Sequence, residues 1–497
     1  MSTQLIILVF YVAVLLAISW WSSLLIKRGT ANKTLNYLLA GRNLPASLVT
    51  VMLTGLAVGG ASTVGVAERA YTQGFSAGWY NAAWGLGGIF VGLTVAKHFR
   101  KMSIKTIPQI MGHMFGPWTR VISVICQLLV MISITALQYV AGGAILTALL
   151  PDVFTFNQGM LASAVIFIII TLFGGYWASG LTNLINVIVI YVGIVVALCA
   201  SLGKFGGLSA LREALPPQGP WFDLISGMGL ATVVAYVLVL MTMATTTQAV
   251  SQICFASKNE ATARNGFLLG GVLILPAGFL CAMFGILAAA NFPNLEKASL
   301  ALPTLATQLS PAVGGLFLAS LWAADISTAV GLLMGCSTLV LEDVVKKIYV
   351  KPLNNAQEIF LSRIVVLLVS LLSFGLALTV VGILKTITTA LAVTTSFTFI
   401  VLAGIYCPGI LKRAAGFWVV LASLVLWIIW TYFPSLRIGP ELIYAEWLVC
   451  GTILLLFAIF AKEPARDIFS SSQADSDANK PPAEHLSKSA PSSGSKA

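Results

Sequence analysis

Thirteen apolar stretches, each about as long as a membrane-spanning helix, divide most of this 497-residue chain. A helix needs roughly 20 mostly apolar residues to cross the hydrocarbon core of a bilayer. Hydrophobic residues make up 58% of the chain and charged residues only 9%, whereas soluble domains carry about 25% charged residues. The sequence therefore predicts an all-α polytopic membrane protein, with candidate helices at 4–26, 46–70, 77–96, 121–150, 159–178, 182–203, 225–253, 266–291, 312–340, 358–380, 386–411, 416–433 and 443–461.

The basic residues indicate how these helices are oriented. With the N-terminus outside, 22 of the 28 Lys and Arg residues fall in cytoplasmic segments and 6 fall outside. This asymmetry satisfies the positive-inside rule, and an odd number of spans then places the C-terminus in the cytoplasm. We expect a multi-pass protein of the plasma (inner) membrane. The net charge of +11 does not indicate nucleic-acid binding, because the cations are spread over short loops.

The order of the stretches predicts how the chain is organised. The segments 46–70 and 225–253 are both unusual helices, and each opens a set of five spans, which suggests an inverted repeat. The polar C-terminal segment has too little apolar surface to fold. We predict a peripheral helix, a cytoplasmic loop, a ten-helix transport core of two repeats, two peripheral helices and a disordered cytoplasmic tail, at 1–26, 27–45, 46–411 (repeats 46–203 and 225–411), 412–461 and 462–497.

The seven cysteines and three histidines carry no metal or catalytic pattern. The cysteines lie within or at the ends of apolar stretches without C-x-x-C spacing, which favours packing over disulfides or zinc. The histidines fall in predicted loops and in the tail. An intramembrane enzyme would need a cluster of His, Cys or acidic residues at depth. We therefore expect neither an enzyme nor a cofactor, and no zinc site.

Two apolar stretches contain groups that are costly inside a membrane. Residues 54–65 include four glycines, each of which lowers helix stability by roughly 1 kcal/mol. In 313–340, Asp325 lies beside Ser327 and Thr328, and an ionised side chain at that depth costs about 2.5–3.5 kcal/mol or more. A broken helix together with buried polar groups is typical of the ion and substrate sites of secondary transporters.

These two stretches can supply the oxygens of a sodium site. If the first helix opens between 55 and 60, the carbonyls of Gly55 and Val58 become available as ligands. Ala324, Ser327 and Thr328 stand at i, i+3 and i+4, so they share one helix face and offer a carbonyl and two hydroxyls. The alternative is that these hydroxyls only bond back to carbonyls of their own helix.

At these residues the chain resembles the sodium:solute symporter family. The resemblance covers most of 35–415 and rests on ordered pieces, none specific alone: Gly41-Arg42, Gly74, Thr106-Ile107-Pro108-Gln109, Gly174-Gly175-Tyr176-Trp177-Ala178, Gln248, Gln252, Ala256-Ser257-Lys258, Leu302-Pro303-Thr304-Leu305, Ala323-Ala324, Ser327-Thr328 and Asp343. The resemblance implies a LeuT-type core of ten helices plus peripheral ones, sodium-driven uptake, and a sodium site at Gly55, Val58, Ala324, Ser327 and Thr328.

The chain departs from the family pattern at two positions. Family members often have Thr-Asp where this chain has Thr182-Asn183, and Asp325 stands where the family usually has an apolar residue. Our hypothesis is that Asp325 replaces the missing charge for coupling, either by stabilising the sodium or by taking up a proton. The alternative is a neutral Asp325 that is hydrogen-bonded within the bundle.

The substrate positions indicate a small or partly apolar solute. Where sugar-transporting relatives use polar or charged groups, only Ser62 and Asn81 remain polar here, so a sugar would lack partners. A monocarboxylate or amino acid fits better, with its carboxylate at the positive end of a half-helix near 59–62. The candidate substrate-binding residues are Ser62, Asn81, Trp84, Gln138, Tyr139, Met243 and Thr247.

The sequence thus predicts a sodium-coupled symporter that imports a small organic solute by alternating access. Its partners would be the solute, the sodium ion and the lipid bilayer, without nucleic acid, and the oligomeric state stays open. One alternative is a proton-coupled symporter that uses Asp325. Another is a transporter-like membrane sensor that acts with a separate partner.

Overall fold

The computed structural model describes residues 3–28, 32–217, 219–349, 351–379, 383–437 and 439–461, so the tail predicted at 462–497 lies outside the described residues. No β-strand occurs in these ranges. The helices are α1 (Thr3–Arg28), α2 (Lys33–Leu39), α3 (Ala46–Ala57), α4 (Val66–Gln73), α5 (Trp79–Leu93), α6 (Ala96–Lys101), α7 (Ile107–Phe115), α8 (Pro117–Leu149), α9 (Phe156–Lys204), α10 (Gly207–Ala214), α11 (Leu230–Thr246), α12 (Gln248–Ala256), α13 (Glu260–Ile274), α14 (Ala277–Asn291), α15 (Ala301–Thr307), α16 (Pro311–Val340), α17 (Lys346–Ile348), α18 (Asn355–Ala377), α19 (Ile383–Ala392), α20 (Thr395–Tyr406), α21 (Arg413–Tyr432) and α22 (Leu442–Phe460).

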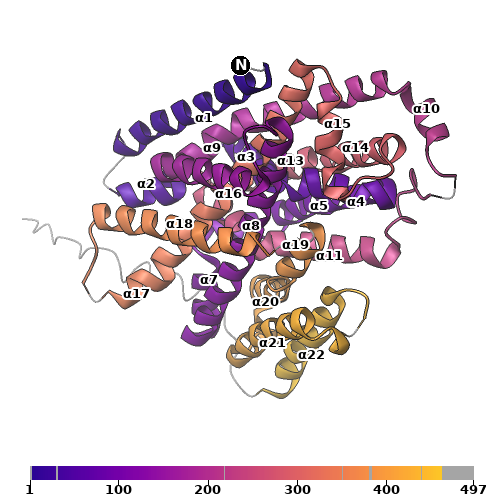
Figure 1. The fold of residues 1–497 in the computed structure, drawn as a ribbon. Coiled ribbons are helices and arrows are strands. Elements are labelled where there is room, and N and C mark those ends of the chain that lie inside the picture. The colour runs from indigo at the N-terminus through magenta and orange to yellow at the C-terminus, as the bar shows by residue number, and fades with distance from the viewer. Residues whose placement is uncertain are drawn as a thin grey trace, which may run out of the picture.

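The helix α16 forms the centre of the bundle (Figure 1). It packs against α1, α3, α8, α9 and α18. In its most apolar stretch 89% of the residues are buried, against 28% in α21 and 28% in α22. A helix buried on all sides can hold polar groups only where they meet partners from neighbouring helices. Ser327, Thr328 and Asp325 all lie in this helix.

The helix predicted to be broken, 46–70, is interrupted in the structure, and so is the second unusual helix, 225–253. The pair formed by α3 and the helical stretch 61–93 is bent by 56°, and the pair α11–α12 by 47°. The helical stretch 61–93, the second part of the first pair, begins with a π-helical turn at Ala61–Gly65 that continues into α4. An isolated parallel β-bridge pairs Leu44, just before α3, with Ser257, just after α12. Its two backbone hydrogen bonds run from the Leu44 amide to the Ala256 carbonyl and from the Lys258 amide to the Leu44 carbonyl. The two broken helices are therefore tied directly to each other.

The number of membrane-spanning segments depends on how the broken and kinked helices are counted. Within the described residues, nine helices are long and apolar enough to cross a membrane, or eleven if each bent pair is one span. α9 has 49 residues, about 74 Å of helix, which is far longer than a bilayer is thick. It is kinked at Gly175 (φ 54°), inside the predicted span 159–178 and near its end, so the kink comes before the predicted span 182–203. The total of thirteen stays a prediction.

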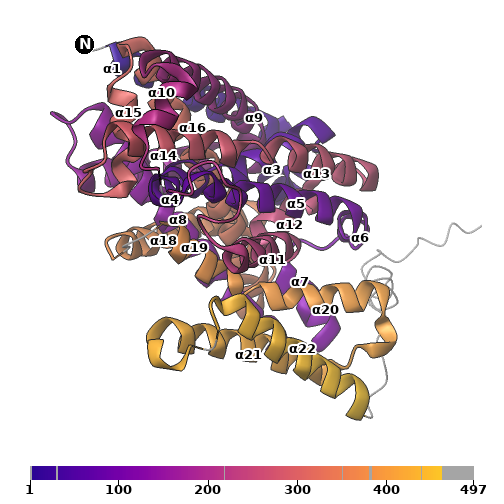
Figure 2. The same ribbon diagram turned by 90° about the vertical axis from the view of Figure 1, so that its right-hand side faces the viewer.

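The helices α21 and α22 pack against each other and lie at one side of the molecule, away from α16 (Figure 2). They contact the rest of the protein through α19 and α20; α21 also touches α7 and α8, and α22 also touches α11. α19 and α20 are separated by a turn at residues 393 and 394. A third interrupted helix thus lies between the bundle and its C-terminal pair.

Candidate functional site

The backbone hydrogen bonds of the first broken helix show how it opens. The Ser62 amide, which would bond the Val58 carbonyl in a continuous helix, instead bonds the Gly59 carbonyl at 3.0 Å. The Gly60 amide turns away from α3 and donates to Oε1 of Gln138 at 2.8 Å. The carbonyls in the last turn of α3 therefore need partners outside their own helix.

Two hydroxyls from α16 meet these carbonyls. Ser327 Oγ lies 2.7 Å from the Gly55 carbonyl oxygen and 2.7 Å from that of Ala324 in its own helix. Thr328 Oγ1 lies 3.0 Å from the Gly55 oxygen and 3.1 Å from the Leu56 oxygen. Ser327 thus contacts both the opened helix, as predicted for a sodium site, and a carbonyl of its own helix, as predicted for the alternative. Thr328 contacts only carbonyls of α3. We call these five residues the first oxygen cluster.

The first oxygen cluster contains more oxygen contacts than hydrogens. Each hydroxyl carries one hydrogen, so Ser327 and Thr328 can satisfy only two of their four contacts with carbonyl oxygens. A small cation would hold the remaining oxygens together, as unwound carbonyls do at sodium sites of transporters. No charged side chain is among the five residues of the cluster. Val58, the fifth predicted ligand, lies in the interruption directly after α3.

Asp325 faces a different part of the break. Its side chain is fully buried, and neither carboxyl oxygen has a hydrogen-bond partner among the described residues. The carboxyl lies against Gly60, because a Cβ placed on that glycine would collide with Asp325 Oδ1. Beyond this contact with the Gly60 backbone, the described residues offer Asp325 no hydrogen bond, and both roles predicted for Asp325 stay hypotheses.

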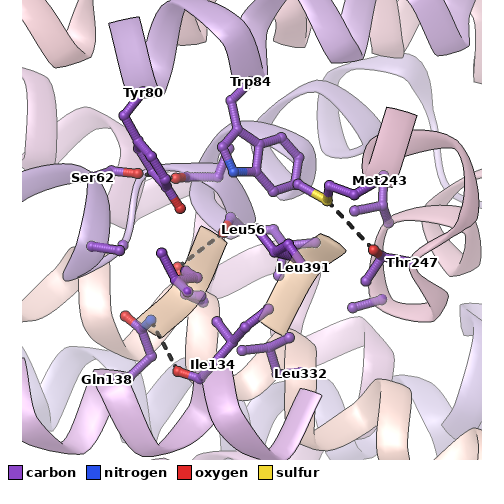
Figure 3. A pocket seen from close by; sticks show the side chains of 17 residues that line it. Leu56, Ser62, Tyr80, Trp84, Ile134, Gln138, Met243, Thr247, Leu332 and Leu391 are labelled. Carbon is purple, nitrogen blue, oxygen red and sulfur yellow. Dashed lines mark hydrogen bonds between the residues drawn. The ribbon is translucent and has the colours of Figure 1, made fainter. Parts of the chain in front are cut away.

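A cavity adjoins the first oxygen cluster, and five of the seven candidate substrate residues line it (Figure 3). Trp84 and Met243 lie next to each other, with Gln138 on the opposite side. None of the described residues that line the cavity is charged, and most are apolar. The five predicted residues are Ser62, Trp84, Gln138, Met243 and Thr247, joined by Thr328 of the first oxygen cluster.

The other two candidate residues lie elsewhere. Tyr139 points away from the cavity, with its hydroxyl 2.6 Å from Ser370 Oγ of α18. Asn81 is fully buried beside Gly278 of α14, and neither atom of its amide has a hydrogen-bond partner among the described residues. Direct contact of Tyr139 or Asn81 with a solute in this cavity is therefore not supported by their positions.

A family model described as the sodium:solute symporter family matches residues 37–433. The chain belongs to this family. As a member, it is a multi-pass membrane transporter and not an enzyme, and sodium is its co-substrate.

Two relatives of this chain are named for different solutes, glucose and proline. The sodium/glucose cotransporter of Vibrio parahaemolyticus is 25% identical over 377 residues, which are 69% of this chain and 68% of the relative. The high-affinity proline transporter PutP of Bacillus subtilis is 22% identical over 366 residues, covering 70% of this chain and 76% of the relative. Family membership thus supports sodium-coupled symport without identifying the solute.

The fold is shared with a solved symporter structure. A Na⁺-coupled sialic acid symporter in a substrate-bound outward-open state superposes with a TM-score of 0.78 at 16% identity. The match covers 93% of this chain and 99% of the other. It confirms the predicted LeuT-like architecture of this symporter.

Two glutamines of α8 hold the broken helices open, and sequence reasoning recognised only one of them as a site residue. Gln138 accepts from the Gly60 amide at the first break. Gln127 donates to the Thr246 carbonyl at 2.7 Å and accepts from the Gln248 amide at 2.8 Å, the groups exposed by the second break. A glutamine amide can replace both halves of a lost backbone bond, because it carries a donor and an acceptor.

Proposed function

We propose that this symporter imports a small organic solute of the monocarboxylate or amino-acid type together with sodium. The observation that supports the proposal most strongly is that the first oxygen cluster and the cavity have residues in common. Thr328 belongs to the first oxygen cluster and also lines the cavity, as does Leu56. An ion and a solute bound there would each affect the position of the same backbone and the same hydroxyl.

We assign the sodium ion to Gly55, Val58, Ala324, Ser327 and Thr328. The contacts described above support Gly55, Ala324, Ser327 and Thr328, with 2.7 to 3.0 Å between neighbouring oxygens. Val58 is included because it lies in the interruption, where the Ser62 amide bonds the Gly59 carbonyl and not that of Val58. An ion there would join α3 to α16. Sodium binding would thereby favour the conformation that also binds the solute, and by linkage the solute raises sodium affinity by the same factor.

The lining of the cavity supports the proposed class of solute. Its walls are mostly apolar, with Trp84 and Met243 among them, and contain no charged side chain in the described residues. A solute carboxylate can instead lie near the N-terminal end of the helical stretch that starts at Ala61, since helix N-termini attract anions. Gln138 and Thr247 provide polar groups to orient the rest of the solute.

We further propose that residues 46–203 and 225–411 are the two repeats that rock against each other. In this arrangement the N-terminus lies outside and the C-terminus in the cytoplasm. The two bent helix pairs and the bonds between Leu44 and the region of Ser257 support a coupled movement of the repeats.

The test is uptake into proteoliposomes with an imposed sodium gradient, screened over carboxylates, amino acids, vitamins and sugars. A thermal-shift screen in sodium first selects solutes that stabilise the purified protein, because a ligand that binds the native state raises its stability. We expect accumulation in sodium and none when choline replaces sodium at fixed pH. Equal accumulation in both buffers would contradict sodium coupling.

Proton coupling through Asp325 is the second candidate function. It is favoured by the absence of any hydrogen-bond partner for the two buried carboxyl oxygens among the described residues. Uptake driven by a proton gradient in choline buffer, and lost in Asp325→Asn, would support it. Normal sodium dependence and an unchanged pH profile in Asp325→Asn would exclude it.

A further inference from the structure

A second group of oxygens lies at the break between α19 and α20. Glu446 of α22 is fully buried there. Its two carboxyl oxygens lie 3.0 Å from Thr395 Oγ1 and 3.0 Å from Ser423 Oγ of α21. The same two hydroxyls lie 2.8 Å from the Ala392 carbonyl and 2.9 Å from the Val393 carbonyl. We call these five residues the second oxygen cluster.

Counting hydrogens shows that the second oxygen cluster is incomplete. Thr395 and Ser423 have one hydrogen each, but they make four contacts with carbonyl and carboxyl oxygens. A proton on Glu446 would supply a third hydrogen and still leave one contact without any. No Lys, Arg or His forms an ion pair with Glu446 in the part of the chain that the structure describes.

We propose that the second oxygen cluster is a second sodium site. Glu446 would balance the charge of one monovalent cation, and a buried carboxylate needs such a partner because leaving it alone costs several kcal/mol. The two hydroxyls and the two carbonyls complete a set of oxygen ligands drawn from four helices (α19, α20, α21 and α22) and from the turn between α19 and α20. This site is separate from the first oxygen cluster, which uses α3 and α16.

The position of the second oxygen cluster connects it to transport. Ala392 ends α19, the helix whose Ile387 and Leu391 line the solute cavity. The Thr394 carbonyl, in the turn between α19 and α20, accepts a 2.7 Å hydrogen bond from Thr246 at the α11–α12 break. An ion that fixes this turn would therefore set the position of a cavity wall and of the second broken helix.

The test is equilibrium binding of radioactive sodium to the purified full-length protein in lipid nanodiscs. We expect two sodium ions per wild-type chain and one per Glu446→Gln chain. Glu441→Gln, the same substitution immediately before α22, is the matched control and should keep two. Loss of the first oxygen cluster alone, in Ser327→Ala/Thr328→Val, should also leave one ion, which separates this proposal from the proposed function.

Milder variants guard against a misfolded Glu446→Gln protein. Thr395→Val and Ser423→Ala each remove one hydroxyl and should weaken the second ion about tenfold, the effect of about 1.4 kcal/mol. Equal sodium counts in wild type and Glu446→Gln would overturn the proposal. So would a pH-dependent thermal stability, measured without sodium, that disappears in Glu446→Gln while the sodium count is unchanged, because Glu446 would then hold a proton.

Discussion

The first and second oxygen clusters share a construction but differ in charge. Each combines two hydroxyls with backbone carbonyls at an interrupted helix, and in each the oxygen contacts outnumber the hydroxyl hydrogens. The first has no charged member, whereas the second includes the buried carboxylate of Glu446. When a cation leaves, a neutral cluster retains no unpaired charge, but a carboxylate would remain buried and alone. We infer that the first suits an ion released in each transport cycle and the second an ion that stays.

The largest effect is expected from closing the first oxygen cluster sterically. A Cβ on Gly59 would collide with Thr328 Oγ1 and approach Gln138 Oε1 to 2.8 Å. Gly59→Ala should therefore lower uptake at least 100-fold, about 2.7 kcal/mol of lost binding, while the second cluster keeps its ion. Gly375→Ala in α18 is the control, because a Cβ there meets no atom within 4 Å. Normal uptake in Gly59→Ala would contradict the inference that the first oxygen cluster, unlike the second, binds the ion that is released in each transport cycle.

A smaller effect is expected from removing one hydroxyl of the first oxygen cluster. Thr328→Val keeps the shape of the side chain but deletes the oxygen that contacts Gly55 and Leu56. We expect the sodium concentration for half-maximal uptake to rise about 10-fold or more. Ser320→Ala is the matched control on the same helix, since the Ser320 hydroxyl donates only to the Phe317 carbonyl. An equal rise in both variants would show that hydroxyls of α16 act only through packing.

The two buried carboxyl groups should respond oppositely to neutralisation. Asp325 has no hydrogen-bond partner in the described structure, so Asp325→Asn should leave the melting temperature unchanged or raise it. Glu446 is contacted by two hydroxyls, so Glu446→Gln should lower the melting temperature in sodium buffer and much less in choline. Thermal unfolding of both variants in the two buffers provides the measurement. Equal, sodium-independent shifts would contradict the assignment of an ion to Glu446.

The smallest effect is expected where the hydroxyl hydrogens are enough to satisfy every oxygen contact, as they are between Tyr139 and Ser370. Tyr139 and Ser370 bring two hydroxyl hydrogens to one 2.6 Å contact, so this pair needs no cation. Tyr139→Phe should cost about 1 kcal/mol of stability and leave the KM for solute and sodium unchanged. Gln138→Leu, one residue earlier, removes the partner of the Gly60 amide and should raise the KM. A raised KM in Tyr139→Phe would return Tyr139 to the substrate site.

The sequence was most informative where function depends on local pattern. Glycines at 55, 59 and 60 indicated the break in the first helix, and the spacing of Ser327 and Thr328 placed both on one face. Gln138 and Tyr139 show the limit of such reasoning. Neighbouring residues of a helix point about 100° apart, and the packing of α8 turns Gln138 toward the cavity and the Tyr139 hydroxyl toward Ser370 of α18.

The second oxygen cluster could not be foreseen because its members are far apart in the chain. Thr395, Ser423 and Glu446 come from three helices, and the last two were expected to be peripheral. A single glutamate near the start of an apolar helix gives no sign of burial until the neighbouring helices are in place. Similarly, Gln127 acquires its role only through the packing of α8 against the α11–α12 break.

We infer that the oxygens of α3 and α16 hold the transported sodium ion. This assignment is tested most directly by equilibrium sodium binding to Ser327→Ala/Thr328→Val, with sodium-dependent uptake measured on the same preparation. We expect this variant to lose one bound ion and all uptake driven by sodium, while Ser320→Ala keeps both. A variant that binds as many ions as the wild type and still accumulates solute in sodium would contradict it.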